Sequence, residues 1–529
     1  MKSLFTLLVA LLLTNFLVAQ IVFQKTIGGK NDDLGNAVQQ TSDGGYIIAG
    51  ETISYGTGNR DVYLVKVDML GDLNWSKTYG GNAEDYALAL DRTSDNGYII
   101  GAHTGSFGQG SHDYYLIKTD SNGGTLFTKL YGGNAPDGIY SLQETLDGGY
   151  ILGGHTSSFG AGAHDFYLIK TNGIGDTEWT KTYGGSSPDY FRSVVSLVTP
   201  TPSYVVVGET SGFGTGGVDI LVVRVDGSAG DIVWAKTYGG SSNDYAFGIY
   251  QTADDGLIIV GHTSSFGAGG TDIYVIKTDH LGNIQWSKTY GGTGNEYGYA
   301  IQQTSDNGYI MVGCTTSFGA GSKDVYLIKT DVNGDTLWTK TYGGGMDEVG
   351  YSIQQTSDDG YIITGNTTSF GAGQKDIYLI KTNANGYSGE CNELPTKTLV
   401  SNSATIETTP ILTVNSGTIT SNSTTVVIDA TPSNLSTCNI LSINSLPGVE
   451  NEILVIPNPF SESAVVKFNY VSGNYTFLLY SITGQLVREV ENINSNQIIV
   501  EKNNLAAGMY FFQLQNDNQI IGSGKLIIE

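Results

Sequence analysis

The sequence predicts an all-β protein: a seven-bladed β-propeller of four-stranded blades, a Thr/Ser-rich linker region and a small antiparallel β-sandwich. The first observation behind this prediction is a unit of 52 residues that recurs seven times between Ile21 and Tyr387. Successive units are 52, 52, 52, 55, 52 and 52 residues apart, counted between Gly-Gly pairs that begin at Gly28, Gly80, Gly132, Gly184, Gly239, Gly291 and Gly343. A fixed period near 50 residues indicates a repeat architecture.

The second observation is that each unit is read as four short strands. In the second unit these are expected over residues 86–93, 98–104, 113–119 and 126–131. Tyr, Ile, Val and Thr dominate the runs, whereas Gly, Asp and Asn dominate the breaks, as strands and hairpin turns require. No segment keeps a helical period for long enough to predict a helix.

The third observation concerns closure of the ring. The last unit stops near Tyr387 without its fourth strand, which carries Trp in five of the other units. Residues 21–29 have the sequence of that missing strand, with Phe23 at the Trp position. A first strand that completes the last unit is what a circular propeller needs to protect its sheet edges, whereas a solenoid needs polar caps. We therefore expect Val22–Ile27 to pair with Asp376–Thr382.

The N-terminus has the features of a secretory signal peptide over residues 1–20. A short basic start is followed by an apolar run from Leu4 to Leu13 and by a small residue, Ala19, before the expected cleavage. The run is shorter than the roughly 20 residues of a transmembrane helix, and no other segment is long and apolar enough to span a membrane. The alternative is an uncleaved anchor.

Charge excludes some partners. The chain of 529 residues has 26 Lys+Arg and 51 Asp+Glu, a formal net charge of −25. Nucleic acids and anionic membranes need a positive field, so neither is an expected partner. Only 15% of the residues are charged, which suits an extracellular β-protein better than a cytoplasmic enzyme. We expect a monomer.

Beyond the repeats, residues 389–451 are rich in Thr and Ser and are interpreted as a linker region between a propeller at 21–388 and a domain at 452–529. Cys391 and Cys438 bracket this region in an exported chain, so a disulfide between them is one prediction. The alternative is a flexible spacer with two free thiols. Cys314 lies inside a propeller strand and is interpreted as a small buried residue.

The final segment is predicted to be a small antiparallel sandwich, because six or seven short apolar runs follow one another within 80 residues. Four ordered motifs, Pro457-Asn458-Pro459-Phe460, Tyr480–Val487 with Gly484, Leu505–Tyr510 with Gly508, and Gly524–Ile528 with Lys525, resemble those of type A C-terminal sorting domains of the type IX secretion system. The resemblance implies export by the signal peptide and then outer-membrane translocation by the type IX translocon. It also implies release, or attachment to the outer cell surface.

Two positions are acidic in all seven units and are predicted to lie at the same face of the propeller. The first set is Asp33, Asp85, Asp137, Asp189, Asp244, Glu296 and Glu348, and the second set is Asp61, Asp113, Asp165, Asp219, Asp272, Asp324 and Asp376. Sevenfold repetition favours carboxylates that accept hydrogen bonds from turn N–H groups. The alternative is cation binding, with the second set as candidate calcium ligands; no other cofactor is expected.

A third position changes from unit to unit: Glu51, His103, His155, Glu209, His262, Cys314 and Asn366. These residue types serve as metal ligands and acid–base groups. Because the seven belong to different blades, we interpret them as polar residues that are hydrogen-bonded locally between blades.

The near-symmetry of the repeats favours a binding, adhesion or structural module over an enzyme, and no catalytic residue is predicted. A glycan or a surface protein is the expected ligand class. The alternative is a polysaccharide-active hydrolase or lyase that uses an acidic pair in the funnel of the propeller.

Overall fold

The computed structural model describes residues 20–197, 202–389, 392–403, 405–408, 413–415, 419–421, 426–429, 433–442, 454–456, 461–468, 475–481, 485–516 and 519–528. Every named element in these ranges is a strand. The chain divides into two compact units, one of which is Val22–Ile440, while the second contains Leu441–Glu529.

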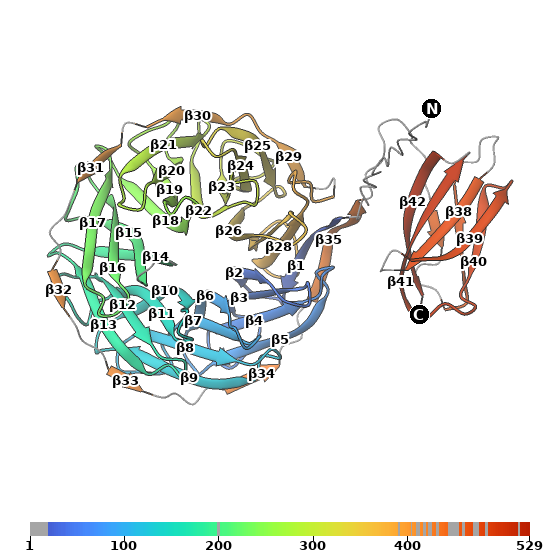
Figure 1. Ribbon diagram of the computed structural model, residues 1–529. Coiled ribbons are helices and arrows are strands. Elements are labelled where there is room, and N and C mark those ends of the chain that lie inside the picture. The colour runs from blue at the N-terminus through green and yellow to red at the C-terminus, as the bar shows by residue number, and fades with distance from the viewer. Residues whose placement is uncertain are drawn as a thin grey trace, which may run out of the picture. The chain divides into compact units, whose positions relative to one another are not determined.

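The first unit is a β-propeller in which seven five-stranded sheets surround a central channel (Figure 1). The innermost strands are β2 (Asp33–Gln40), β6 (Asp85–Arg92), β10 (Asp137–Glu144), β14 (Asp189–Leu197), β18 (Asp244–Gln251), β22 (Glu296–Gln303) and β26 (Glu348–Gln355). The second strands are β3 (Tyr46–Thr52), β7 (Tyr98–Thr104), β11 (Tyr150–Thr156), β15 (Ser203–Thr210), β19 (Leu257–Thr263), β23 (Tyr309–Thr315) and β27 (Tyr361–Thr367).

The third strands lie in the interior of each sheet, and all of their residues are buried except two in the fourth sheet. They are β4 (Asp61–Val67), β8 (Asp113–Thr119), β12 (Asp165–Thr171), β16 (Asp219–Asp226), β20 (Asp272–Thr278), β24 (Asp324–Thr330) and β28 (Asp376–Thr382). The fourth strands are β5 (Leu73–Gly80), β9 (Thr125–Gly132), β13 (Thr177–Gly184), β17 (Ile232–Gly239), β21 (Ile284–Gly291), β25 (Thr336–Tyr342) and β1 (Gln20–Gly28).

Strand β1 closes the ring, as the sequence predicts. It pairs antiparallel with β28, with Phe23 opposite Lys381 and Ile27 opposite Ile377. Val22, Phe23 and Ile27 are buried. The last sheet therefore joins residues more than 350 positions apart, since its other strands, β26 to β28, come from the end of the repeats.

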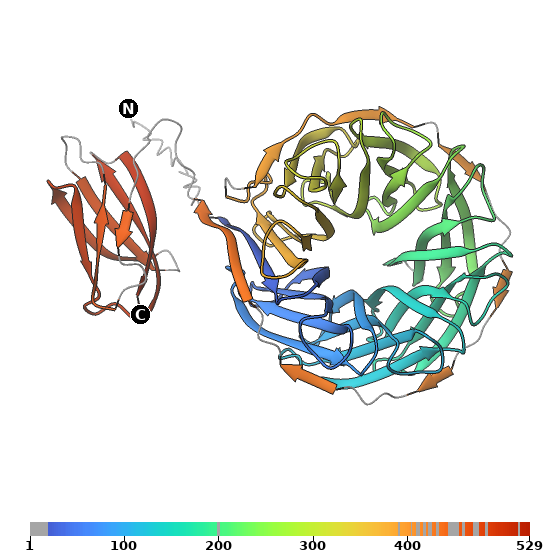
Figure 2. The same ribbon diagram turned by 180° about the vertical axis from the view of Figure 1, so that it is seen from behind.

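Each sheet has a fifth strand that the sequence analysis does not predict. These strands come from residues 393–442, here called the belt: β29 (Glu393–Pro395), β30 (Leu399–Asn402), β31 (Ile406–Thr408), β32 (Thr413–Asn415), β33 (Ile419–Ser421), β34 (Val426–Asp429) and β35 (Ser433–Ser442). They pair in turn with β25, β21, β17, β13, β9, β5 and β1, so the belt runs around the outside of the ring against the order of the repeats (Figures 1 and 2).

The belt corrects the interpretation of residues 389–451 as a linker region. The fourth strand of a free-standing blade leaves a row of unpaired N–H and C=O groups, which is a template for aggregation. The belt pairs with that row in every sheet, over three or more residues in each case, as in Gly291↔Leu399 to Lys288↔Asn402. The blades are therefore five-stranded, not four-stranded.

At the inner edge of the sheets, backbone N–H groups of the innermost strands donate hydrogen bonds to side chains of the neighbouring sheet. The backbone N–H of Arg92 donates to Oε1 of Gln39 (3.0 Å), and the N–H of Gln40 donates to Oε1 of Gln354 (2.6 Å). Gln355 and Gln302 form the same contact at 2.7 Å. The repeated Gln-Gln pairs thus connect successive innermost strands around the channel, where an unpaired N–H would otherwise cost free energy.

Neighbouring sheets share their hydrophobic cores. One cluster combines Ile47 and Leu64 of the first sheet with Ile100 and Ile117 of the second. Tyr79 of the fourth strand is fully buried and donates its hydroxyl to the carbonyl of Gly123 in the next sheet (2.7 Å). The same bond recurs from Tyr131, Tyr183, Tyr238, Tyr290 and Tyr342. This bond accounts for the Tyr before six of the seven Gly-Gly pairs.

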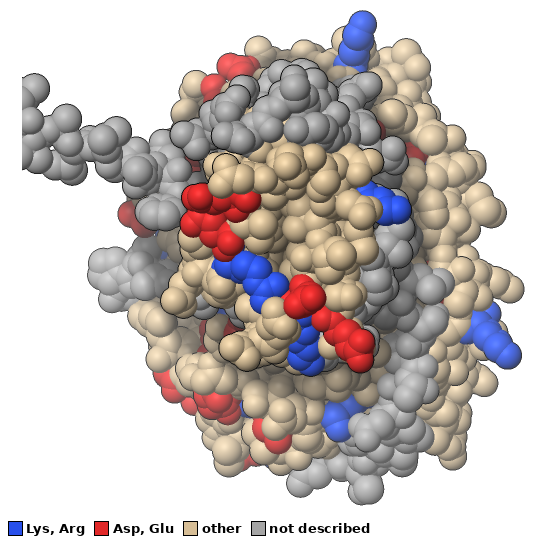
Figure 3. All heavy atoms as spheres, turned by 90° about the vertical axis from the view of Figure 1, so that its right-hand side faces the viewer, with Lys and Arg blue, Asp and Glu red and all other residues tan. Residues whose placement is uncertain are grey.

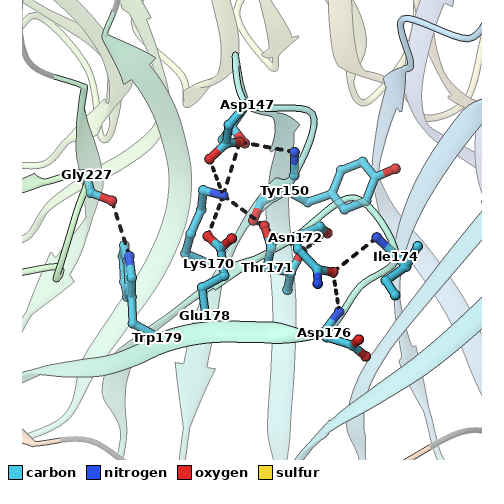
Figure 4. A network of polar contacts seen from close by, with 12 residues as sticks. Asp147, Tyr150, Lys170, Thr171, Asn172, Ile174, Asp176, Glu178, Trp179 and Gly227 are labelled. Carbon is cyan, nitrogen blue, oxygen red and sulfur yellow. Dashed lines mark hydrogen bonds and ion pairs between the residues drawn. The ribbon is translucent and has the colours of Figure 1, made fainter.

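A buried lysine in the third strand neutralises the aspartate of the turn between the first two strands. Figure 4 shows Lys170 with its ammonium group beside Asp147 (2.9 Å), Glu178 (3.0 Å) and the carbonyl of Thr171. Burial acts against the charged carboxylate, but hydrogen bonds from Thr145 and Lys170 outweigh it and lower the pKa of Asp147 to about 2. The fourth sheet departs from the pattern, because Arg224 there donates to Ser203.

The second unit consists of two antiparallel sheets. One contains β36 (Leu454–Ile456), β37 (Ser463–Lys467) and β40 (Gln497–Glu501), and the other contains β39 (Leu486–Ile493), β38 (Tyr475–Ser481), β41 (Gly508–Asn516) and β42 (Gln519–Ile528). Residues of both sheets, including Val466, Val500, Phe477 and Phe512, form one hydrophobic core. This agrees with the predicted small antiparallel sandwich.

Candidate functional site

The fourteen acidic residues form seven carboxyl pairs, each between neighbouring sheets. In each pair, the acid that begins a third strand and the acid that begins the next innermost strand approach the same glycine. A Cβ atom on Gly239 would stand 1.9 Å from Oδ1 of Asp219 and 2.8 Å from Oδ2 of Asp244. The other pairs are Asp376/Asp33, Asp61/Asp85, Asp113/Asp137, Asp165/Asp189, Asp272/Glu296 and Asp324/Glu348. Their proximity requires a glycine at the first position of every Gly-Gly pair.

Backbone N–H groups bind these carboxylates. Each acid of the first set accepts a hydrogen bond from the second Gly of its own Gly-Gly pair, as Asp244 does from Gly240 (2.7 Å) and Glu296 from Gly292 (2.7 Å). Acids of the second set accept from the glycine-rich loop before their strand, as Asp165 does from Ala161 and Gly162 at 3.0 Å each. All fourteen side chains are buried.

Burial and the neighbouring carboxylate raise the pKa values of several of these acids. The pKa of Asp219 rises to about 7, first because of burial and then because of Asp244. Burial likewise raises the pKa values of Asp61, Asp189 and Asp376 to about 6. An acid whose pKa is raised in this way takes up a proton at a higher pH than a free aspartate does, and a cation beside the pair would relieve the repulsion between the two carboxylates.

Calcium binding by Asp61, Asp113, Asp165, Asp219, Asp272, Asp324 and Asp376 stays a prediction. In the ranges that the structure describes, no group of three or more His, Cys, Asp or Glu side chains is arranged to hold a metal ion. A calcium ion at one of the pairs would need its other ligands from backbone carbonyl oxygens or water.

The repeats lose their symmetry at the channel, where the fourth residue of each innermost strand differs. Five consecutive sheets carry Tyr140, Arg192, Phe247, Tyr299 and Tyr351 at this position, here called the inner arc. The guanidinium of Arg192 lies 5.5 Å from the ring of Tyr140 and 4.8 Å from that of Phe247. Ring centroids of Phe247 and Tyr299, and of Tyr299 and Tyr351, are 5.3 Å apart. The remaining two sheets carry Asn36 and Leu88.

The inner arc is available to a ligand. Its five side chains are half-buried, and they alternate with the fully buried third residue of each strand. Each of them lies at the β-bulge of its innermost strand, and its intermediate burial leaves part of the side chain accessible to solvent. The sequence analysis missed these residues, although an aromatic residue three positions after the acid of the first set in four of the seven repeats was a usable signal.

The third, varying position lies directly behind the arc. His103 stacks on Tyr86 and makes contacts at 3.0 Å with its hydroxyl and at 2.9 Å with the carbonyl of Ile139 in the next sheet. His262 stacks on Phe247 of the arc, with 5.2 Å between ring centroids. Burial lowers the pKa values of His103 and His262 to about 3 and about 4, so both are neutral at pH 7.

Two of the varying residues are glutamates that form ion pairs. Arg192 of the arc binds Glu209 through Nη2 (2.6 Å) and Nε (3.1 Å), and Arg60 lies 3.3 Å from Glu51. Burial raises the pKa values of both glutamates. Cys314 is buried and unpaired, and burial raises its pKa to about 12, so it is a thiol at neutral pH.

A cavity of about 210 Å³ lies farther along the innermost strands. Gln39, Tyr250, Gln302 and Gln354 contribute to its wall, together with residues of β6. The channel therefore offers an aromatic section at the arc and an amide-rich section at the cavity.

Several predicted features fall outside the described residues. These are the signal peptide, Pro457-Asn458-Pro459-Phe460, Gly484 and Cys391. The side chain of Cys438 is not described either, so the disulfide between Cys391 and Cys438 stays a prediction. Of the other motif residues, Gly508 begins β41 with φ 148°, Tyr510 is buried in the core, and Lys525 lies in β42.

Residues 454–529 match the model of the secretion system C-terminal sorting domain family. The curated regulatory protein FlaEY of Caulobacter vibrioides is 22% identical over 376 residues, which is 64% of this chain. The chain spans only 35% of the length of that relative.

Among solved structures, NanB sialidase from Streptococcus pneumoniae has a TM-score of 0.36 at 9% identity, with 69% of this chain and 71% of that chain covered. An endo-1,5-alpha-L-arabinanase from Thermotoga petrophila has a TM-score of 0.25 at 10% identity, with 68% and 99% covered. Neither similarity assigns an activity to this chain. In the described part of the chain, no helix has the length and apolar character needed to cross a membrane.

Proposed function

We propose that the propeller of this chain is a glycan-binding module. Because its C-terminal segment is a sorting domain, the chain is cargo of the type IX secretion system and is delivered to the cell surface or secreted. The observation that carries the proposal is the inner arc. Aromatic rings present flat apolar faces, and a few polar groups beside them give orientation to a bound ligand. The aliphatic C–H face of a sugar ring fits such a surface, with Arg192 as a hydrogen-bond donor.

Charge on the surface agrees with this class of ligand. The face in Figure 3 is mostly uncharged, with a few Lys, Arg, Asp and Glu side chains scattered over it. A net charge of −25 disfavours nucleic acid, whereas a neutral glycan requires no positive field. The propeller would act as a monomer, because each channel contains a complete arc.

The glycan proposal predicts loss of binding when the arc is truncated. Phe247→Ala and Tyr299→Ala, made in the mature chain, should each weaken binding to the best ligand on a glycan array by about tenfold, because each removes a stacking face worth about 1–2 kcal/mol. Leu337→Ala is the control, since this side chain is exposed on the outer strand β25. Equal affinities for all three variants would contradict the proposal.

The alternative is a polysaccharide-active hydrolase or lyase. One observation favours it: burial raises the pKa values of Glu51 and Glu209, as a general acid requires. Incubation of the mature chain with a polysaccharide panel decides between the two. Cleavage by the wild type that is lost in Glu209→Gln would replace the binding proposal.

The sorting domain and the belt should be separable in function. Removal of residues 452–529 should retain the protein in the periplasm while leaving its Tm unchanged, because β35 ends at Ser442 and the belt stays complete. Removal of residues 389–529 deletes the belt as well and should lower the Tm. Cell fractionation and thermal unfolding check both variants, and surface display of the first would contradict its role in export.

A further inference from the structure

The outer part of five of the seven sheets contains a pair of hydroxyl groups, one from Tyr in the third strand and one from Ser or Thr in the fourth. In the fifth sheet these are Tyr274 and Ser287, and in the sixth they are Tyr326 and Thr339. Both tyrosine side chains are at most 1% exposed. A buried hydroxyl without a partner costs about 1–3 kcal/mol, so each pair needs a partner from elsewhere.

The belt supplies that partner. In the fifth sheet Thr405 is hydrogen-bonded to the hydroxyl of Tyr274 and lies 2.8 Å from Oγ of Ser287. In the sixth sheet Thr398 is hydrogen-bonded to the hydroxyl of Tyr326 and donates to Oγ1 of Thr339 (3.1 Å). The two belt threonines are seven residues apart, and the belt strands β30 and β31 also begin seven residues apart.

A second residue of the belt reinforces each contact. In the fifth sheet, Ser403 donates its hydroxyl to Oγ of Ser287 (2.6 Å). In the sixth sheet, Thr396 is likewise hydrogen-bonded to Thr339. The residues between these hydroxyls face outward, since all four residues of β30 are exposed. The belt therefore binds through its backbone and through one face of hydroxyl groups.

The fourth sheet has neither hydroxyl. Leu221 replaces the Tyr of its third strand, and Ala235 replaces the Ser or Thr of its fourth strand. Both are buried. Seven residues after Thr405, the sequence has Leu412, which carries no hydroxyl.

The seventh sheet satisfies its tyrosine without the belt. The hydroxyl of Tyr378 donates to Oε1 of Gln24 in β1, and the amide of that glutamine donates to Ser388 (2.7 Å). Gln24 occupies the position of Ser287 and Thr339 but is long enough to reach the tyrosine itself. The belt strand on this sheet, β35, has ten residues and is the longest strand of the belt.

From these contacts we propose that the outer edges of the fifth and sixth sheets form a docking surface for a Ser/Thr-rich extended strand, whose position along each edge is set by one threonine hydroxyl, that of Thr405 or Thr398. Its occupant is the belt of the same chain. Backbone pairing alone does not set the register of strands as short as three or four residues. A slip of one residue buries the tyrosine hydroxyl without a partner, so the hydroxyl pairs hold each belt strand on its own sheet.

Hydrogen exchange of the mature full-length chain tests the docking surface. Thr405→Val removes the hydroxyl but keeps the shape of the side chain. The amides of residues 399–403 should then exchange about tenfold faster, the equivalent of about 1.4 kcal/mol. Thr405→Ser keeps the hydroxyl and should exchange at the wild-type rate.

The triple variant Tyr274→Phe, Ser287→Ala, Thr405→Val reproduces the apolar pattern of the fourth sheet and should restore slow exchange to within about threefold of the wild type. Unchanged exchange in Thr405→Val, or faster exchange in the triple variant than in the single one, would overturn the proposal. So would a stable dimer of Thr405→Ser or of the wild type in which light scattering and isotope mixing show that belts are exchanged between copies.

Discussion

Deletion of residues 21–29 is expected to make the propeller aggregate. These residues form β1, which lies between β28 and β35 in the last sheet. Without β1 the side chains of Val22, Phe23 and Ile27 no longer contribute to the core, a loss of about 5–8 kcal/mol of hydrophobic stabilisation. The edges of β28 and β35 are exposed at the same time, and unpaired edges associate with other chains.

A point substitution gives a finer test of ring closure. Ile27→Ala should destabilise the propeller by about 2–5 kcal/mol, because Ile27 is fully buried opposite Ile377. Leu126→Ala, on the exposed face of β9, is the matched control and should leave the Tm within about 1 °C. Size-exclusion chromatography with light scattering and thermal unfolding measure both effects. A deletion variant that stays monomeric with the wild-type Tm would show that β1 does not hold the ring closed.

Asp219→Asn is expected to stabilise the propeller at pH 8 by about 1–2 kcal/mol. The folded protein raises the pKa of Asp219 from 3.8 to about 7, so at pH 8 it holds an ionised carboxylate that burial and Asp244 both disfavour. An amide keeps an acceptor oxygen and carries no charge.

The pH dependence has a definite sign. Because the folded pKa of Asp219 lies above the unfolded value, the wild type gains stability from this group as the pH falls through 7 towards 4. The advantage of Asp219→Asn should therefore shrink over that window and vanish near pH 4. Denaturant unfolding at pH 8, 6 and 4 measures it. Asp231→Asn, at an exposed turn of the same sheet, is the control, and an advantage that grows on acidification would contradict the buried pair.

Calcium distinguishes the two interpretations of the carboxyl pairs. If backbone N–H groups satisfy them, millimolar calcium and EDTA should give the same Tm. A cation bound only by the folded protein would instead add about 2.7 kcal/mol at a hundredfold excess over its Kd. A large stabilisation by calcium that disappears when Asp324→Asn and Glu296→Gln are combined with the equivalent substitutions in the other sheets would establish the carboxyl pairs as metal sites.

The belt shows where prediction from the sequence stops. Its signal was present, since Leu399, Ile406, Ile419 and Val426 follow one another at multiples of about seven residues. Strands of three or four residues are too short to be recognised by alternation, however, and their partners lie up to about 350 residues away. Thr and Ser at the intervening positions have the composition of a spacer, although two of them, Thr398 and Thr405, bind buried tyrosines.

The candidate sites, too, were predicted only in part from the sequence. Fourteen repeated acids could be recognised in the sequence, but their pairing across sheets around one glycine depends on the rotation between neighbouring sheets. The inner arc combines side chains of five repeats, of which only Arg192 stands out locally as a departure from the repeat. Local secondary-structure propensity cannot predict a contact between residues that are 52 positions apart.

By itself, the sequence determined the period of 52 residues, the strand order within each unit, ring closure by residues 22–27 and the sorting domain. Each of these follows from short-range periodicity or from a motif, which depend on neighbours along the chain. Only the tertiary structure decided the five-stranded sheets, the seven carboxyl pairs and the inner arc. The physical reason is that unpaired sheet edges and buried polar groups find their partners wherever the folded chain brings them, independently of distance along the sequence.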